Sequence, residues 1–126
     1  MRVLFVCVEN SCRSQIAEAF ARIHGGGRVE AYSAGSRPSL EVNPKAVASM
    51  AEVGYDLAPH TPTGLDAVSG EGFDHAITMG CGDECPHIEA DTHDDWDIPD
   101  PKNMPPDEFR EVRDLIERKV KELIGE

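Results

Sequence analysis

The sequence lacks any apolar run that approaches the roughly 20 residues needed to cross a bilayer as a helix. It also lacks an export signal at its start, because Met1 and Arg2 lead into a short apolar stretch without a small-residue cleavage motif. We therefore expect a cytoplasmic protein. Repeats and low-complexity segments are missing too. A length of 126 residues, 40% of them hydrophobic, then predicts a single globular domain over 1–126.

Basic residues are scarce, with 12 Lys and Arg against 24 Asp and Glu and a formal net charge of −12. Nucleic acid is a poor partner for such a chain, because contact with phosphate backbones needs clustered positive charge. A small anion would also be repelled by the mean field. Any anion site must therefore be local, built from backbone N–H groups, a helix N-terminus and a well-placed arginine.

Strand and helix signals alternate along the chain. Val3–Val6 is a continuous apolar run, typical of a strand covered on both faces. Val29–Ser33 and Asp74–Met79 predict two further strands, and a fourth short strand is expected within His93–Pro101. Trp96, inside that last segment, is expected to pack the following loop onto the core.

Helices are predicted between these strands by apolar residues at helical spacing. One begins at Arg13 and ends at the glycines 25–27, a second begins at Asn43–Pro44 and ends at Gly54, and a third follows Pro106. A short helix or turn is expected within Thr61–Val68. The apolar faces are predicted to consist of Ile16, Ala17, Phe20, Ile23, Val47, Met50, Ala51, Val53, Phe109, Val112, Leu115, Ile116, Val120 and Leu123.

This alternation predicts an α/β fold of three layers, with a four-stranded parallel sheet and helices on both faces. Ligands of such sheets bind beyond the carboxyl ends of the strands. Cys7, Cys81 and Asp100 all follow predicted strand ends, so they are expected at one edge. The segment Gly80–Asp100 is too long for an ordinary connection and is a candidate functional loop.

The turn after the first strand has the pattern C-x5-R-S, from Cys7 to Ser14. A five-residue loop that enters a helix can turn several backbone N–H groups inward around a tetrahedral oxyanion, and Arg13 adds a two-pronged clamp. The same positive environment favours the thiolate of Cys7, the form that acts as a nucleophile. Ser14 can donate a hydrogen bond to that thiolate, and Asn10 suits a left-handed turn. The predicted oxyanion-binding residues are Val8, Glu9, Asn10, Ser11, Cys12, Arg13 and Ser14.

The four cysteines fall into two close pairs, Cys7 with Cys12 and Cys81 with Cys85. In a reducing cytosol, clustered cysteines favour catalysis, redox chemistry or metal binding over structural disulfides. Cys12 has no independent signal and is interpreted as a small packed residue. For the second pair, a metal site with His87 and His93 and a pair of inert packed thiols remain as alternatives. A chain that held zinc or a stable disulfide at this pair, without turnover, would be a non-catalytic metal- or redox-sensing module.

The stretches CVENSCRSQIAE, YSAG and NPKA, with a late DP, resemble the low-molecular-weight protein tyrosine phosphatase fold, and most closely its thioredoxin-coupled arsenate reductases. The resemblance implies that Cys7 is the nucleophile and that Asp100, before Pro101, is the general acid. It also implies that Cys81 attacks Cys7 to release arsenite, and that Cys85 then moves the disulfide to a surface loop for thioredoxin or glutaredoxin. The two later cysteines are closer together here than in those reductases.

Arsenate reduction is thus the favoured function. Phosphate is expected to bind in the same pocket, and a monomer is sufficient for the activity. The alternative is an aryl phosphate or tyrosine phosphatase, which needs Cys7 but neither Cys81 nor Cys85. No tyrosine follows the D-P step, where the phosphatases carry aromatic residues. No bound cofactor is expected. The resemblance implies a potassium or sodium site near the ligand positions Asn10, Glu18 and Ser33, with Thr63 in place of an aspartate, or else a hydrogen-bonded polar cluster there.

Overall fold

The computed structural model describes residues 1–68, 72–79 and 89–125. In this part of the chain, no helix is both long and apolar enough to span a membrane. The 3-10 helices are named η here. The elements in chain order are β1 (Arg2–Cys7), α1 (Arg13–Gly25), η1 (Gly26–Arg28), β2 (Glu30–Gly35), α2 (Pro44–Ala51), η2 (Leu65–Val68), β3 (Phe73–Thr78), β4 (Ala90–Asp95) and α3 (Pro106–Ile124).

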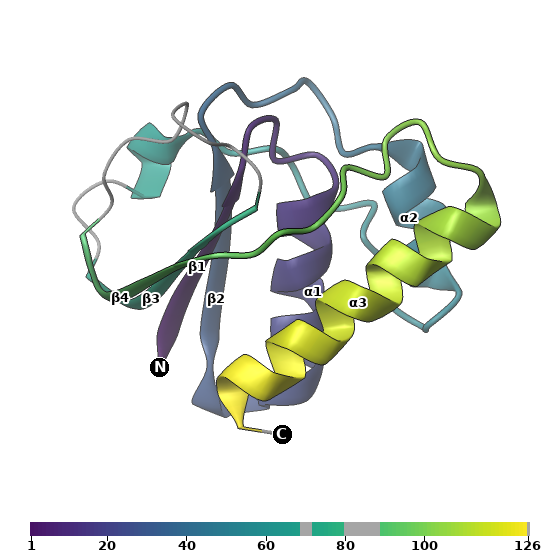
Figure 1. The fold of residues 1–126 in the computed structure, drawn as a ribbon. Helices are drawn as coiled ribbons and strands as arrows, with labels where there is room; N and C mark the ends of the chain where they lie inside the picture. Colours follow the sequence, from purple (N-terminus) through teal and green to yellow (C-terminus); the bar gives the residue numbers. More distant parts are fainter. Residues whose placement is uncertain (69–71, 80–88, 126) are drawn as a thin grey trace.

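The strands form one parallel sheet in the order β2-β1-β3-β4 (Figure 1). β1 lies between two neighbours, and its side chains from Val3 to Val6 are fully buried, as its continuous apolar run predicts. Because the strands all run the same way, their carboxyl ends lie at the same edge. The predicted four-stranded parallel α/β fold is confirmed.

Alternate residues of β1 face two different apolar clusters. Val3 and Phe5 join the larger cluster, which α1, α2 and α3 cover from one side of the sheet (Figure 1). Leu4 and Val6 join a smaller cluster on the other side, where Val68 of η2 packs. Helical cover on both faces is therefore present, with the described α-helices on one face and the short η2 on the other.

The fourth strand lies earlier than predicted. β4 ends at Asp95, before Trp96, whereas the prediction placed a strand within 93–101. Its sequence, ADTHDD, has no apolar alternation because β4 is an edge strand whose side chains are mostly exposed, and its backbone pairs with β3. Trp96 is buried and packs on Phe5 with ring centroids 5.9 Å apart, so its predicted packing role is confirmed.

Three residues predicted for the core, Ile23, Ala51 and Val53, are exposed. Ile23 is 44% and Val53 is 41% accessible to solvent. Ile23 lies in the last turn of α1, and Val53 lies beyond Ala51, where α2 ends. The helical spacing of the apolar residues thus continues past the buried part of each helix.

Candidate active site

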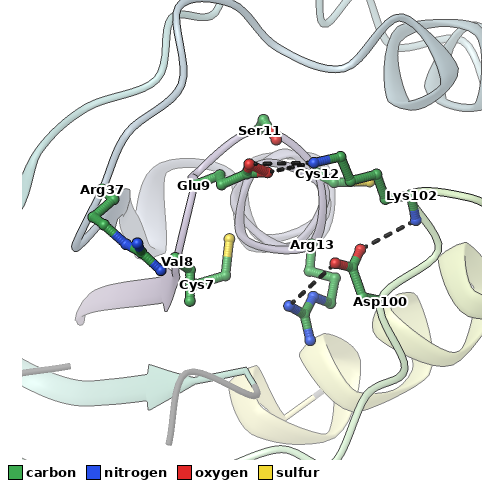
Figure 2. Close-up of a pocket in the computed structure, with 9 residues that line it drawn as sticks. All are labelled: Cys7, Val8, Glu9, Ser11, Cys12, Arg13, Arg37, Asp100 and Lys102. Atoms are coloured by element: carbon green, nitrogen blue, oxygen red, sulfur yellow. Dashed lines mark hydrogen bonds and ion pairs between the residues drawn. The ribbon is translucent and has the colours of Figure 1, made fainter. Parts of the chain in front are cut away.

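A cavity of about 640 Å³ opens where three segments meet (Figure 2). The first is the turn between β1 and α1, the second follows β2, and the third precedes α3. This places Cys7, Arg13 and Asp100 around one cavity, as the strand-end argument predicts. The lining residues are Cys7, Val8, Glu9, Ser11, Cys12, Arg13, Arg37, Asp100 and Lys102.

The carbonyl groups of the β1–α1 turn are bonded to the chain that surrounds it. The oxygens of Val8, Glu9 and Ser11 accept hydrogen bonds from backbone N–H groups of residues 37, 39 and 43, at 2.8, 3.0 and 2.9 Å. In a trans peptide the C=O and the next N–H point in opposite directions. The outward carbonyls therefore leave the following N–H groups for the inner side of the turn, which suits an anion.

Asn10 fixes the shape of this turn. It has a φ of 50°, in the left-handed region where asparagine is favoured over most residues. Its Oδ1 accepts from the Thr63 backbone N–H at 2.8 Å and from Gln15 Nε2 at 3.0 Å. Because a backbone N–H can only donate, the Asn10 amide nitrogen must face the other way, and it donates to Ser14 Oγ at 2.7 Å. The Ser14 hydroxyl is left to donate to Cys7 Sγ, 2.9 Å away.

The positions considered for a monovalent cation are bonded to one another and to their neighbours. Glu18 Oε1 accepts from Ser33 Oγ at 2.7 Å, and Glu18 Oε2 accepts from Arg22 Nε at 3.0 Å. His60 Nδ1 lies 3.6 Å from Glu18 Oε2, and burial lowers the His60 pKa below its usual value. Asn10 Oδ1 is also engaged, so in the described structure these groups are joined by hydrogen bonds to one another and to the turn.

Arg13 connects the turn to the loop that carries Asp100. Its side chain is 11% exposed, Nη1 donates to the Ile98 carbonyl at 2.9 Å, and Nη2 lies 3.9 Å from Asp100 Oδ2. Arg13 is the first residue of α1, so the positive end of the helix dipole adds to the guanidinium charge. Asp100 is half exposed at the cavity, where a carboxyl group can exchange its proton with solvent.

Cys12 also lines the cavity, but its thiol is not activated. Burial, followed by the charge of Asp100, raises the Cys12 pKa to about 12. A thiol with that pKa stays protonated at neutral pH and is a weak nucleophile. The structure thus supports the interpretation of Cys12 as a packed residue.

The sequence did not indicate two residues of the cavity, and two predicted site residues lie outside the described part of the chain. Arg37 and Lys102 line the cavity; the available signal was their position just after the SAG and DP steps. Cys81 and Cys85 lie outside the described residues, as does His87, so the proposed metal alternative for that segment also stays a prediction. Within the described residues, no group of three or more His, Cys, Asp or Glu is placed to hold a metal ion.

Gly35, the last residue of β2, lies against the backbone of the turn. A Cβ at this position would lie 2.5 Å from the Val8 oxygen, 2.9 Å from the Asn10 nitrogen and 3.0 Å from the Cys7 oxygen. We expect Gly35→Ala to displace the turn, weaken phosphate binding at least about tenfold and lower stability by about 1–3 kcal/mol, as overpacking does. Calorimetric titration with phosphate and thermal unfolding measure both. Gly27→Ala, which meets no atom within 4 Å, is the matched control; equal affinities in the two variants would contradict the expectation.

The chain is similar to known proteins over nearly its whole length. The family model described as low molecular weight phosphotyrosine protein phosphatase matches residues 2–126. A curated relative from Synechocystis, named glutaredoxin arsenate reductase, is 36% identical over 127 residues, which cover 98% of this chain and 96% of the relative.

The chain is also similar in fold to solved structures of arsenate reductases. An arsenate reductase in the phosphate binding state superposes with a TM-score of 0.88 at 35% identity, covering 98% of this chain and 96% of that one. A thioredoxin-dependent arsenate reductase from Corynebacterium glutamicum superposes with a TM-score of 0.76 at 34% identity, covering 97% of this chain and 59% of that one.

Proposed function

The chain belongs to the low molecular weight phosphotyrosine protein phosphatase family, and from this premise we propose that it is an arsenate reductase that works through a relay of cysteines. The observation that carries the proposal is the cavity around Cys7, Arg13 and Asp100, in a chain whose sequence has two further cysteines downstream, Cys81 and Cys85. The names of the relatives support arsenate as the substrate. Ester hydrolysis would need only the cavity, whereas reduction needs a second thiol.

In the first step, the Cys7 thiolate attacks arsenic in a bound dihydrogen arsenate ion. A sulfur–arsenic bond forms and an arsenic–oxygen bond breaks. The departing oxygen takes a proton from Asp100 and leaves as water. Ser14 donates to the sulfur, and Arg13 with the loop N–H groups holds the remaining oxygens. The arsenic is still pentavalent at this point.

In the second step, the Cys81 thiolate attacks the Cys7 sulfur. A disulfide forms, the sulfur–arsenic bond breaks, and its electron pair stays on arsenic, which leaves as arsenite and takes up protons from water. The two thiols have supplied the two electrons. The end of β3 supports this step, because the N–H of Met79, the residue that follows β3, donates to the oxygen of Val6, next to Cys7, at 2.9 Å.

In the third step, Cys85 attacks Cys81, so that the disulfide moves from Cys7–Cys81 to Cys81–Cys85 and Cys7 is again a thiolate. An external dithiol then reduces that disulfide and is itself oxidised. We propose a thioredoxin or a glutaredoxin as this donor, because relatives of both descriptions exist. A reducing cytoplasm and a monomeric enzyme are sufficient for the cycle.

The phosphatase alternative is less well supported by the walls of the cavity. The lining residues found in the described part of the chain include no aromatic side chain that could flank a phosphotyrosine ring. The lining instead includes five charged residues, which are Glu9, Arg13, Arg37, Asp100 and Lys102. A bare inorganic oxyanion needs only hydrogen bonds and positive charge, which this cavity provides.

Cysteine substitutions test the relay. With NADPH, thioredoxin reductase and thioredoxin, and separately with glutathione and glutaredoxin, the wild type should reduce arsenate over many turnovers. Cys85→Ser should release about one arsenite per enzyme and stop, because Cys7 and Cys81 still supply two electrons. Cys81→Ser should release almost none.

Three outcomes would contradict parts of this proposal. Full multiple turnover in both serine variants would exclude the relay. A wild type that hydrolyses p-nitrophenyl phosphate but releases no arsenite would favour the phosphatase. Zinc in the purified protein at one equivalent, without either activity, would favour a metal-binding module.

A further inference from the structure

The loop that carries Asp100 is held to the oxyanion-binding turn at two points, one on each side of Asp100. On the upstream side, Arg13 Nη1 donates to the Ile98 carbonyl at 2.9 Å. On the downstream side, Lys102 Nζ donates to both carboxylate oxygens of Glu9, at 3.2 and 3.4 Å. Figure 2 shows Lys102 reaching across the cavity to Glu9 while Asp100 faces Arg13.

Lys102 also contacts Asp100 directly. Its backbone N–H donates to Asp100 Oδ1 at 3.1 Å, which leaves Oδ2 on the side of Arg13. A displacement of Lys102 would therefore shift the Asp100 carboxyl. On the far side of Lys102, its carbonyl accepts from Lys45 Nζ at 3.1 Å, so α2 holds the backbone here while Glu9 holds the side chain.

We propose that the Glu9–Lys102 ion pair is a positioning device that holds Asp100 over the oxyanion site, so that Glu9 and Lys102 are positioning residues for the proton transfer. Glu9 is otherwise hard to explain, because a carboxylate at the rim of an anion site opposes anion binding. Its pairing with Lys102 removes that penalty and links the turn with the loop. The proposal rests on the proposed function for the identity of the step that Asp100 assists.

Two possible roles of Glu9, one through its charge and one through the position of Asp100, predict opposite effects of Glu9→Gln. If Glu9 acted only through its charge, its removal would help an anion bind and would leave the chemical step unchanged or faster. If Glu9 positions Asp100, the chemical step slows while the KM for arsenate does not rise. We expect the single-turnover rate of arsenite release at saturating arsenate to fall about two- to fivefold, the range that an exposed ion pair supports.

A cycle with Asp100→Asn gives the decisive measurement. Glu9→Gln should slow arsenite release in the wild-type background and should have no further effect in the Asp100→Asn background, because Glu9 acts through Asp100. Lys102→Gln should behave like Glu9→Gln, whereas Lys102→Arg, which keeps the ion pair, should retain at least half of the wild-type rate. Raising the salt concentration should slow the wild type toward Glu9→Gln, since salt screens an exposed pair.

Glu30→Gln is the matched control. Glu30 pairs with Arg2 at 2.9 Å and is similarly exposed, but it starts β2 at the opposite edge of the sheet. Its replacement should leave the rate unchanged. The proposal is overturned if Glu9→Gln does not slow the reaction, if it slows both backgrounds equally, or if Asp100→Asn has no effect. If the wild type releases no arsenite, the proposed function fails separately, and p-nitrophenol release from the same variants decides the role of the pair.

Discussion

Replacement of Cys7 with serine is expected to abolish arsenite release, with a loss on the order of 10⁴-fold or more, the scale seen when a catalytic nucleophile is removed. A serine hydroxyl is protonated at neutral pH, and it cannot supply an electron pair by forming a disulfide. The turn itself should survive, because Asn10 is held by Thr63 and Gln15 without help from the sulfur. Phosphate should therefore still bind, and its affinity, measured by calorimetry, should not fall.

Cys12→Ser is the matched substitution at the other thiol of the cavity. Because a pKa of about 12 keeps the Cys12 thiol protonated at neutral pH, we expect the variant to retain multiple turnover. Stopped-flow single turnovers with arsenate compare the two variants directly. Loss of arsenite release in Cys12→Ser with retention in Cys7→Ser would reverse the assignment of the nucleophile.

The parts of the site that depend on local sequence were predictable. A turn of five residues between an apolar strand and a helix leaves the thiol at Cys7 and the guanidinium at Arg13 few ways to be arranged. The alternation of strands and helices predicts a parallel sheet. A late loop that follows a strand is then expected at the same edge as Cys7, because the carboxyl ends of parallel strands lie together. Asp100 at the cavity follows from those two arguments, and the structure places it there.

Features that depend on pairing between distant residues were not predictable. Glu9 and Lys102 are 93 positions apart, and neither the turn pattern around Glu9 nor the D-P step before Lys102 indicates that they pair. β4 was placed too late because an exposed edge strand carries no apolar alternation. The importance of Gly35 comes from its close approach to the Val8 oxygen, a contact between β2 and the turn that the sequence does not indicate. In each case the physical cause lies in a partner from another segment.

Arg13→Lys is the second substitution for which we expect a large effect. The Arg13 side chain is mostly buried and makes two contacts with the Asp100 loop in addition to facing the cavity. Lysine keeps the charge but lacks the planar fork that binds an oxyanion with two parallel hydrogen bonds, and a single ammonium cannot also reach the Ile98 carbonyl. The loss of a partner from a buried, charged hydrogen-bonded pair costs about 2–5 kcal/mol. We therefore expect the phosphate Kd to rise at least about 30-fold.

Arg37→Lys is the matched control, the same substitution at the other arginine that lines the cavity. Arg37 lines the same cavity but is exposed, so this variant should change the phosphate Kd less than about threefold, as exposed charges do. The arsenite release rate should fall further in Arg13→Lys than the affinity alone explains, because the Ile98 tether of the Asp100 loop is lost as well. If both lysine variants bind phosphate as tightly as the wild type, the planar fork of Arg13 is not needed to hold the oxyanion. With a net charge of −12 opposing any anion, the positive charge at position 13, the loop N–H groups and the α1 dipole would then supply the attraction.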